Sequence, residues 1–154
     1  MKILVFSDTH GSFQPMFDAV NREAPNYIIH LGDCVRDAER LMEMLPDCPV
    51  ICVSGNCDPM NMRPELQIRE ICGLRFLITH GHKYSVKTGL LRLLYAAMEA
   101  QVEVVLFGHT HRPMSQEREG MMLINPGACG GTSPTYGLLT IEAGRLRCDI
   151  KAMT

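Results

Sequence analysis

In the stretch KILVFSDTHGS, residues 2–12, an apolar run is followed directly by polar turn residues. This change of character is the first indication of the fold. Residues 2–6 form a short, largely apolar run of the kind that predicts a buried strand. An amphipathic helix is expected next, with Ser12 at its N-cap and Pro15 tolerated in the first turn. The apolar side chains at helical spacing in this segment are Phe13, Met16, Phe17 and Val20.

The same alternation continues along the first third of the chain. Residues 27–31 and 49–53 form two further apolar runs, and the segment 35–45 between them has the period of a helix. Strand, helix and strand in succession indicate parallel pairing through right-handed crossovers.

The second half of the chain predicts more strands and one helix. Two strands are expected to meet at Cys72-Gly73, and Ala143-Gly144 has the residues of a hairpin turn. The other expected elements are a helix over 88–101 and strands over 102–107, 114–119, 121–125, 136–142 and 145–151. We therefore predict a single α/β domain over residues 1–154, a four-layer α-β-β-α sandwich of two mixed sheets flanked by helices.

Composition excludes several function classes. A length of 154 residues fits about one domain. A net charge of −2 with no Lys/Arg run disfavours a nucleic-acid-binding patch. The seven cysteines form no CxxC pair, which favours reduced thiols over a disulfide framework. No signal-peptide core or apolar run of roughly 20 residues is present, so we expect a cytoplasmic protein without a membrane partner.

Five of the predicted strands are followed by side chains of the metal-ligand type. In chain order these are Asp8 and His10, Asp33, Asn56, His80 and His82, and His109 and His111. The carboxyl ends of strands are where ligand crevices form in α/β sheets. Each dipeptide alone is a common turn sequence. Five strand ends with the same kind of residue favour a shared metal site, whereas His30, inside its strand, is interpreted as structural.

The spacing of these residues gives a further expectation. Residues i and i+2 of an extended segment project to the same side. Asp8 with His10, His80 with His82, and His109 with His111 are therefore each expected to aim two side chains together.

The ligand set indicates which metals to expect. Imidazole mixed with carboxylate suits Mn, Fe, Zn or Ni, and not the all-oxygen sites of Ca. About seven ligands exceed the needs of one tetrahedral ion, so two ions sharing a carboxylate is the simplest arrangement. Two-metal sites hold their ions about 3.5–4 Å apart, activate a bridging hydroxide and neutralise a phosphoryl group during in-line attack. Phosphoester hydrolysis is the chemistry that this set predicts.

In this order, the motifs resemble the calcineurin-like metallophosphoesterase family. They are Asp8-x-His10, Gly32-Asp33, Gly55-Asn56-Cys57-Asp58, His80-Gly-His82 and Gly108-His109-Thr-His111. The short chain and the GNCD form resemble the small prokaryotic-type phosphodiesterase branch. The resemblance implies a β-sandwich flanked by helices and a binuclear site in which Mn is the usual activating ion.

The resemblance also implies roles for single residues. The first ion would be held by Asp8, His10 and His111, and the second by Asn56, His80 and His109. Asp33 would bridge the two ions. Metal-held Asp33, Asn56 and His80 would then be catalytic. Asn56, Cys57 and His82 are the expected substrate contacts, with His82 either beside a ligand or on the phosphate.

Cys57 departs from the family pattern. Many relatives carry a histidine at this position, placed to contact substrate and to protonate the leaving group. A thiol with a reference pKa near 8.5 is a weak substitute for an imidazolium. Cys57 either shapes the pocket, leaving the chemistry to the metals, or contacts phosphate or acts as a redox group.

Two classes of function remain open. The first is a hydrolase that cleaves a small phosphodiester or, alternatively, a phosphomonoester. The second is a non-catalytic scaffold of the same fold, as in the retromer subunit that resembles this family. The presence of all seven ligand positions favours catalysis. The apolar residues of 88–101 fit either a homodimer interface or core packing.

Overall fold

In the computed structural model, which describes residues 1–154, the apolar run at the N-terminus is the central strand of one sheet. This first sheet has the order β10-β9-β1-β2-β3. Its strands are β1 (Lys2–Phe6), β2 (Tyr27–His30), β3 (Val50–Cys52), β9 (Thr135–Glu142) and β10 (Arg145–Ala152). Strands β1, β2 and β3 are parallel, and β9 is antiparallel to both β1 and β10.

The second sheet has the order β4-β5-β6-β8-β7. Its strands are β4 (Leu66–Ile71), β5 (Leu74–Thr79), β6 (Val104–Leu106), β7 (Met114–Arg118) and β8 (Met121–Asn125). Strands β5, β6 and β8 are parallel, and the two edge strands are antiparallel to their neighbours. Both sheets are therefore mixed, as the sequence predicted.

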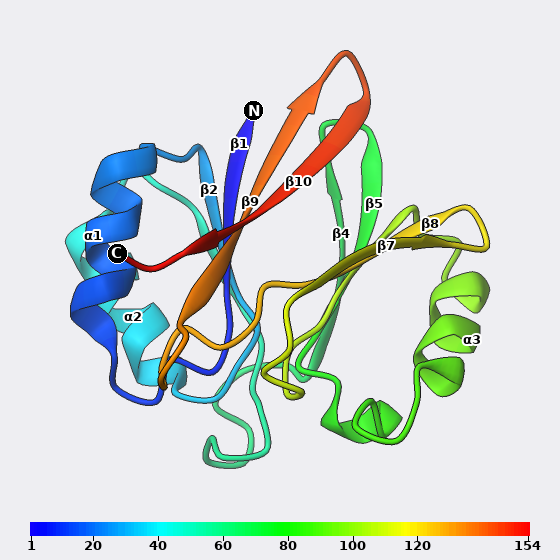
Figure 1. Ribbon diagram of the computed structural model, residues 1–154, viewed down its shortest axis with the longest axis horizontal. Coiled ribbons are helices and arrows are strands. Elements are labelled where there is room, and N and C mark those ends of the chain that lie inside the picture. Colours follow the sequence, from blue (N-terminus) through cyan, green and yellow to red (C-terminus); the bar gives the residue numbers. More distant parts are fainter.

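The helices cover the outer faces of the two sheets (Figure 1). They are α1 (Phe13–Glu23), α2 (Val35–Met44) and α3 (Leu91–Glu99), with a 3-10 turn, η1, over His82–Tyr84. The crossover helices α1 and α2 lie against the first sheet and α3 lies against the second (Figure 1). The layers follow in the order α-β-β-α, so the predicted fold class is confirmed.

Alternate side chains of β1 explain why its sequence is apolar from Ile3 to Phe6. Ile3 and Val5 point into the core between the two sheets. Leu4 and Phe6 point outward and pack under α1. A strand buried on both faces has no position for a polar side chain. Its polar continuation therefore begins where the strand ends, and this places Asp8 at the edge of the sandwich.

Several predicted elements are shorter in the structure, and the helix over 88–101 and the strand over 102–107 lose the most residues. The helix expected over 88–101 begins at Leu91, because Ser85 and Thr88 close a turn through their backbones before it. It ends at Glu99, and Gln101 has a left-handed φ of 52°. The strand expected over 102–107 is limited to Val104–Leu106.

The outer surface of α3 is partly apolar. Leu93 and Ala97 are buried against the second sheet, but Leu91, Tyr95 and Met98 are 62%, 62% and 50% exposed. Core packing therefore accounts for only some of the apolar residues of 88–101, and a homodimer through the others stays a prediction. No helix in the structure has the length and apolar character needed to cross a bilayer.

Candidate metal centre

The loops that follow β1, β2, β3, β5 and β6 meet at one end of the sandwich. Strands of one parallel set end at the same edge of their sheet, and the two sheets bring these edges together. Two groups of potential ligands form there, Asp8 with His10 and His111, and Asp33 with His80 and His109. Within each group, all the ligand atoms lie within 4.8 Å of one another.

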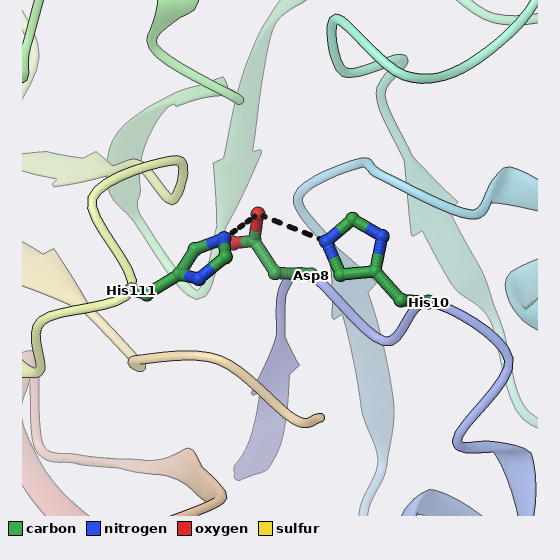
Figure 2. A group of neighbouring side chains, drawn as sticks. All are labelled: Asp8, His10 and His111. Carbon is green, nitrogen blue, oxygen red and sulfur yellow. Dashed lines mark hydrogen bonds and ion pairs between the residues drawn. The ribbon is translucent and has the colours of Figure 1, made fainter. Parts of the chain in front are cut away.

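Asp8 is the buried member of the first group. Its Oδ1 lies 3.0 Å from Nε2 of His111 and 4.0 Å from Nε2 of His10. Figure 2 shows the two imidazole rings on either side of the carboxylate. The other oxygen, Oδ2, accepts hydrogen bonds from the Ser7 hydroxyl at 2.6 Å and from the backbone N–H of His109 at 3.2 Å. Because Oδ2 is occupied, Oδ1 is left to face the two histidines.

His80 is the buried centre of the second group. Its Nε2 lies 3.1 Å from Asn56 Oδ1, 3.2 Å from His109 Nδ1 and 3.5 Å from Asp33 Oδ2. Asn56 thus joins the histidines and Asp33 at this position.

Asp33 lies between the two groups. Its Oδ2 is 3.5 Å from Nε2 of His80 in the second group and 3.8 Å from Nε2 of His10 in the first. Its Oδ1 accepts the backbone N–H of Cys57 at 2.9 Å. Asp33 Oδ2 therefore faces both groups, which is the geometry required of a bridging ligand. Asp8 Oδ1 also lies 3.9 Å from Nε2 of His80, but it is closest to His111, at 3.0 Å.

The hydrogen bond made by Nδ1 of His80 determines whether its Nε2 is a donor or an acceptor. Nδ1 lies 2.7 Å from the carbonyl oxygen of Leu31, and a carbonyl only accepts, so Nδ1 carries a proton. In the neutral ring, Nε2 is then an acceptor, and it faces two further acceptors, Asn56 Oδ1 and Asp33 Oδ2. Such a set of facing acceptors is satisfied by a cation, and the outer hydrogen bond is the one that metal-bound histidines make.

The pKa shifts agree with a need for positive charge. Burial opposes protonation of His80, but the neighbouring carboxylates of Asp33 and Asp8 outweigh it and raise the His80 pKa. Burial acts to raise the pKa of Asp33, but His80 and the Cys57 N–H lower it overall. Burial and the nearby charge of His80 lower the pKa of His109 to about 4.

The expectation based on i, i+2 pairs holds for Asp8 with His10, which share a group, but it is wrong for His109 with His111, and the backbone at these four residues is not extended. Asp8, His10, His109 and His111 all have left-handed φ values, of 54°, 45°, 67° and 58°. The chain turns sharply after each strand, so His109 and His111 fall in different groups. Left-handed conformations of non-glycine residues cost free energy and persist only where the surroundings hold them. Here the convergence of the loops supplies those contacts.

His82 and His30 stay outside the two groups. Nε2 of His82 lies 3.6 Å from Oε1 of Glu65, and its ring centroid is 5.5 Å from that of His80. His30 is fully buried, its Nδ1 accepts the Gly32 N–H at 3.2 Å, and its Nε2 lies 3.2 Å from the Thr9 hydroxyl. His30 therefore contacts the loops after β1 and β2, which agrees with its interpretation as a structural residue.

Cys57 lies exposed at the rim of the centre. Burial of the sulfur and the negative charge of Asp33 raise the pKa of the thiol above its ordinary value. The group is therefore a neutral thiol near pH 7. It lines a hollow of about 330 Å³ together with His10 and Cys34.

Asp58 has a structural function that its sequence motif did not indicate. Its carboxylate accepts four backbone N–H groups at 2.8 Å, those of Asp33, Cys34, Val35 and Gly55. It thereby ties the loop after β2 to the loop after β3 and occupies the N-terminus of α2. A Cβ at Gly55 would collide with the Asp33 carboxylate, so glycine is required for this approach. The signal in the sequence is an aspartate at the end of a turn that begins with Gly55, because aspartate side chains accept backbone N–H groups in turns.

Asn125 fixes the loop that carries His109 and His111. Its Nδ2 donates to the Gly108 carbonyl and to the Thr110 hydroxyl, both at 3.0 Å, and its Oδ1 accepts the Gly127 N–H at 2.9 Å. A Cβ at Gly108 would overlap the Ser7 hydroxyl. The loop after β6 therefore lies directly on the loop after β1, which brings the two ligand groups together.

Comparison with known proteins gives consistent matches along the chain. A family model described as a calcineurin-like phosphoesterase superfamily domain matches residues 1–144. A phosphodiesterase of Methanocaldococcus jannaschii is 31% identical over 172 residues, covering 96% of this chain and 97% of that protein. A crystal structure of a predicted phosphoesterase from Streptococcus pneumoniae has a TM-score of 0.83 at 26% identity, covering 99% of this chain and 89% of the other. Zinc-complexed Vps29 from Entamoeba histolytica has a TM-score of 0.77 at 20% identity over 100% of both chains, which shows the fold alone.

Proposed function

The chain belongs to the calcineurin-like phosphoesterase superfamily, and we propose on that basis that it is a phosphodiesterase working with two divalent metal ions. The observation that carries the proposal is the position of Asp33, whose Oδ2 faces His10 of one ligand group and His80 of the other. The name of the archaeal relative, a phosphodiesterase, supports the choice of diesters.

The side chains present fit two such ions. Asp8, His10 and His111 would hold one, and Asn56, His80 and His109 the other, with Asp33 shared between them. A donor set of carboxylate, amide and imidazole, without thiolate, accommodates Mn, Fe, Zn or Ni, and we propose Mn because the family resemblance implies it. Bound there, two divalent ions would acidify a water molecule for in-line attack on phosphorus and neutralise charge on the phosphoryl group.

The protein's own residues position this chemistry. Leu31 fixes the tautomer of His80 through its carbonyl, and Asp58 holds the backbone of Asp33. Cys57 lies where it would meet the substrate, but a neutral thiol with a raised pKa protonates a leaving group poorly. The enzyme should therefore hydrolyse diesters with good leaving groups best, while Asn56 and His82 at the rim contact the phosphoester.

Two alternatives follow from the same geometry. A phosphomonoesterase would use the same ligands on a substrate with more negative charge. A non-catalytic interaction protein is the other alternative, because Vps29 has the same fold at 20% identity. We also propose a cytoplasmic location, which is supported by seven free cysteines.

The test begins with metal-free protein reloaded with Mn. Turnover of bis(4-nitrophenyl) phosphate faster than 4-nitrophenyl phosphate supports a phosphodiesterase, and the reverse order supports the monoesterase. Asp33→Asn should abolish turnover, whereas Asp47→Asn, an identical change at an exposed position, should not. No turnover of either substrate with two ions bound per chain would favour the interaction protein. Retained activity in Asp33→Asn would overturn the two-metal proposal.

A further inference from the structure

A pocket of about 530 Å³ opens next to the loop that carries His109 and His111. It lies between the segment 86–90 and the residues that follow β6, and we call it the side pocket. Its lining includes Lys87, Leu90, Phe107, Thr110, Arg112 and Met114. Pockets for small molecules in proteins are typically about 300–1,000 Å³ and largely apolar, with a few polar groups. The side pocket has this size, and four of its eight lining residues are hydrophobic.

The side pocket is adjacent to the candidate metal centre. Thr110, which lines it, stands between His109 and His111 in the chain. Burial and His80 are the main causes of the low pKa of His109, and the charge of Lys87 also contributes. The wall that separates the pocket from the centre is fixed, because the Asn125 side chain donates to both Gly108 and Thr110.

The two cations at the side pocket have no carboxylate partner. Lys87 and Arg112 are both exposed. The lysines and arginines that do form ion pairs are Arg22, Arg63, Lys83, Arg147 and Lys151. Lys87 and Arg112 therefore offer two unpaired positive charges beside the apolar surface made by Leu90, Phe107 and Met114.

A second pocket, of about 450 Å³, flanks the centre on the side of Asn56 and differs in character. It is lined mainly by polar residues, and its Lys83 is already paired with Glu65. Met60, at 89% exposure, stands in its wall. Of these two pockets, only the side pocket combines an apolar surface with unpaired cations. The smaller hollow at Cys57, of about 330 Å³, has one exposed cation, Arg36.

We propose that the side pocket receives one ester arm of a phosphodiester substrate, an arm with an apolar ring that carries a negative charge of its own. The ring would lie on Leu90, Phe107 and Met114, and its anionic group would face Lys87 and Arg112. This inference rests on the proposed phosphodiesterase function. A diester has an arm to place in the pocket besides its leaving group, whereas a simple monoester has none.

Three synthetic diesters test the proposal on the Mn-loaded enzyme. Each has 4-nitrophenol as leaving group, and the second arm is methyl, phenyl or 4-carboxyphenyl. Because the leaving group is the same, ratios of kcat/KM report on the second arm alone. We expect phenyl to exceed methyl by about tenfold. We expect 4-carboxyphenyl to exceed phenyl by about threefold to fivefold, in line with exposed ion pairs.

Matched variants assign these preferences to the side pocket. Met114→Trp should bring the phenyl-to-methyl ratio close to one, and Met60→Trp in the second pocket should preserve it. Lys87→Glu with Arg112→Glu should reverse the preference for 4-carboxyphenyl over phenyl. Arg118→Glu, at the other end of β7, should leave that preference in place. If Met114→Trp does not fold by its thermal melt, Leu90→Trp fills the same pocket and carries the same expectation.

The outcomes separate this proposal from the function on which it rests. Wild type that hydrolyses none of the three diesters with two ions bound contradicts the phosphodiesterase itself. Wild type that hydrolyses all three at equal kcat/KM overturns only the side pocket proposal. Equal effects of Met114→Trp and Met60→Trp on the phenyl-to-methyl ratio would also overturn it.

Discussion

Oδ2 of Asp58 accepts the backbone N–H of Asp33 at 2.8 Å. Asp58 lies outside both ligand groups, yet it sets the position of Asp33, the carboxylate that would bridge the two metal ions. The same oxygen accepts the Gly55 N–H at 2.8 Å. Two loops that follow different strands are thereby joined through one side chain. The position of Asp33 relative to both ligand groups depends on this junction.

Removal of the Asp58 carboxylate should therefore weaken metal binding without removing a ligand. Asp58→Ala leaves four backbone N–H groups without their acceptor. We expect Mn affinity to fall by about 10- to 100-fold, as for other residues that orient ligands. The free energy of unfolding should fall by about 1–3 kcal/mol. Calorimetric Mn titration and urea unfolding measure both, with Asp47→Ala as the exposed control. Unchanged Mn affinity in Asp58→Ala would show that Asp33 is positioned by other contacts.

Bound metal should stabilise the fold, because the ligands come from loops that follow five different strands. A ligand that binds only the folded state at 100 times its Kd adds about 2.7 kcal/mol to the free energy of unfolding. Adding Mn to metal-free protein should therefore raise Tm by several degrees. The shift should be small in Asp33→Asn and full in Asp47→Asn. An equal rise in Asp33→Asn would mean that the ion binds away from the two groups.

Protonation of His30 should destabilise the metal-free protein in mild acid. Burial lowers the pKa of His30 to about 4 in the folded state, against about 6.5 in the unfolded chain. Above pH 6.5 neither state is protonated and the group has no effect. As pH falls from 6.5 towards 4, the unfolded chain takes up the proton first, so stability is lost.

The size of this effect is measurable. Between pH 7 and pH 5 the His30 contribution falls by about 2 kcal/mol by linkage. Urea unfolding of metal-free wild type and of His30→Asn, each at pH 7 and pH 5, isolates the His30 contribution, because the two proteins have all other histidines in common. The wild type should lose about 2 kcal/mol more than the variant over this interval. Parallel losses would place the folded-state pKa of His30 near its ordinary value.

The fold was predictable from the sequence because burial leaves a direct pattern. Ile3 and Val5 face one core while Leu4 and Phe6 face another, so the segment from Ile3 to Phe6 is apolar and ends abruptly. The polar residues that follow five such strands are brought to one end of the sandwich. That convergence follows from parallel pairing, which strand and helix order indicates.

The geometry within the centre was not predictable in this way. His109 and His111 separate into two groups because both have left-handed φ values, and no sequence periodicity encodes such a turn. The role of Asp58 depends on two loops that meet only after the sheet has formed. The side pocket likewise needs Lys87 and Arg112, which are far apart in the chain. Residue patterns alone identified the ligand types. The division of His109 and His111 between two groups was expected only from the family resemblance, because tertiary contacts decide it.

The thiol of Cys57 should contribute little to hydrolysis, because burial and Asp33 raise its pKa and keep it neutral. Cys57→Ala should lower kcat by less than about tenfold, well below the 10²-fold or greater cost of losing a general acid. Cys57→His should raise kcat for diesters with poor leaving groups, such as diphenyl phosphate, because an imidazolium can protonate the departing oxygen. It should have little effect on bis(4-nitrophenyl) phosphate, whose leaving group needs no proton. Steady-state kinetics of the three proteins on both substrates measures this difference. A loss above about 10²-fold for Cys57→Ala on diphenyl phosphate would assign the thiol a direct part in leaving-group departure.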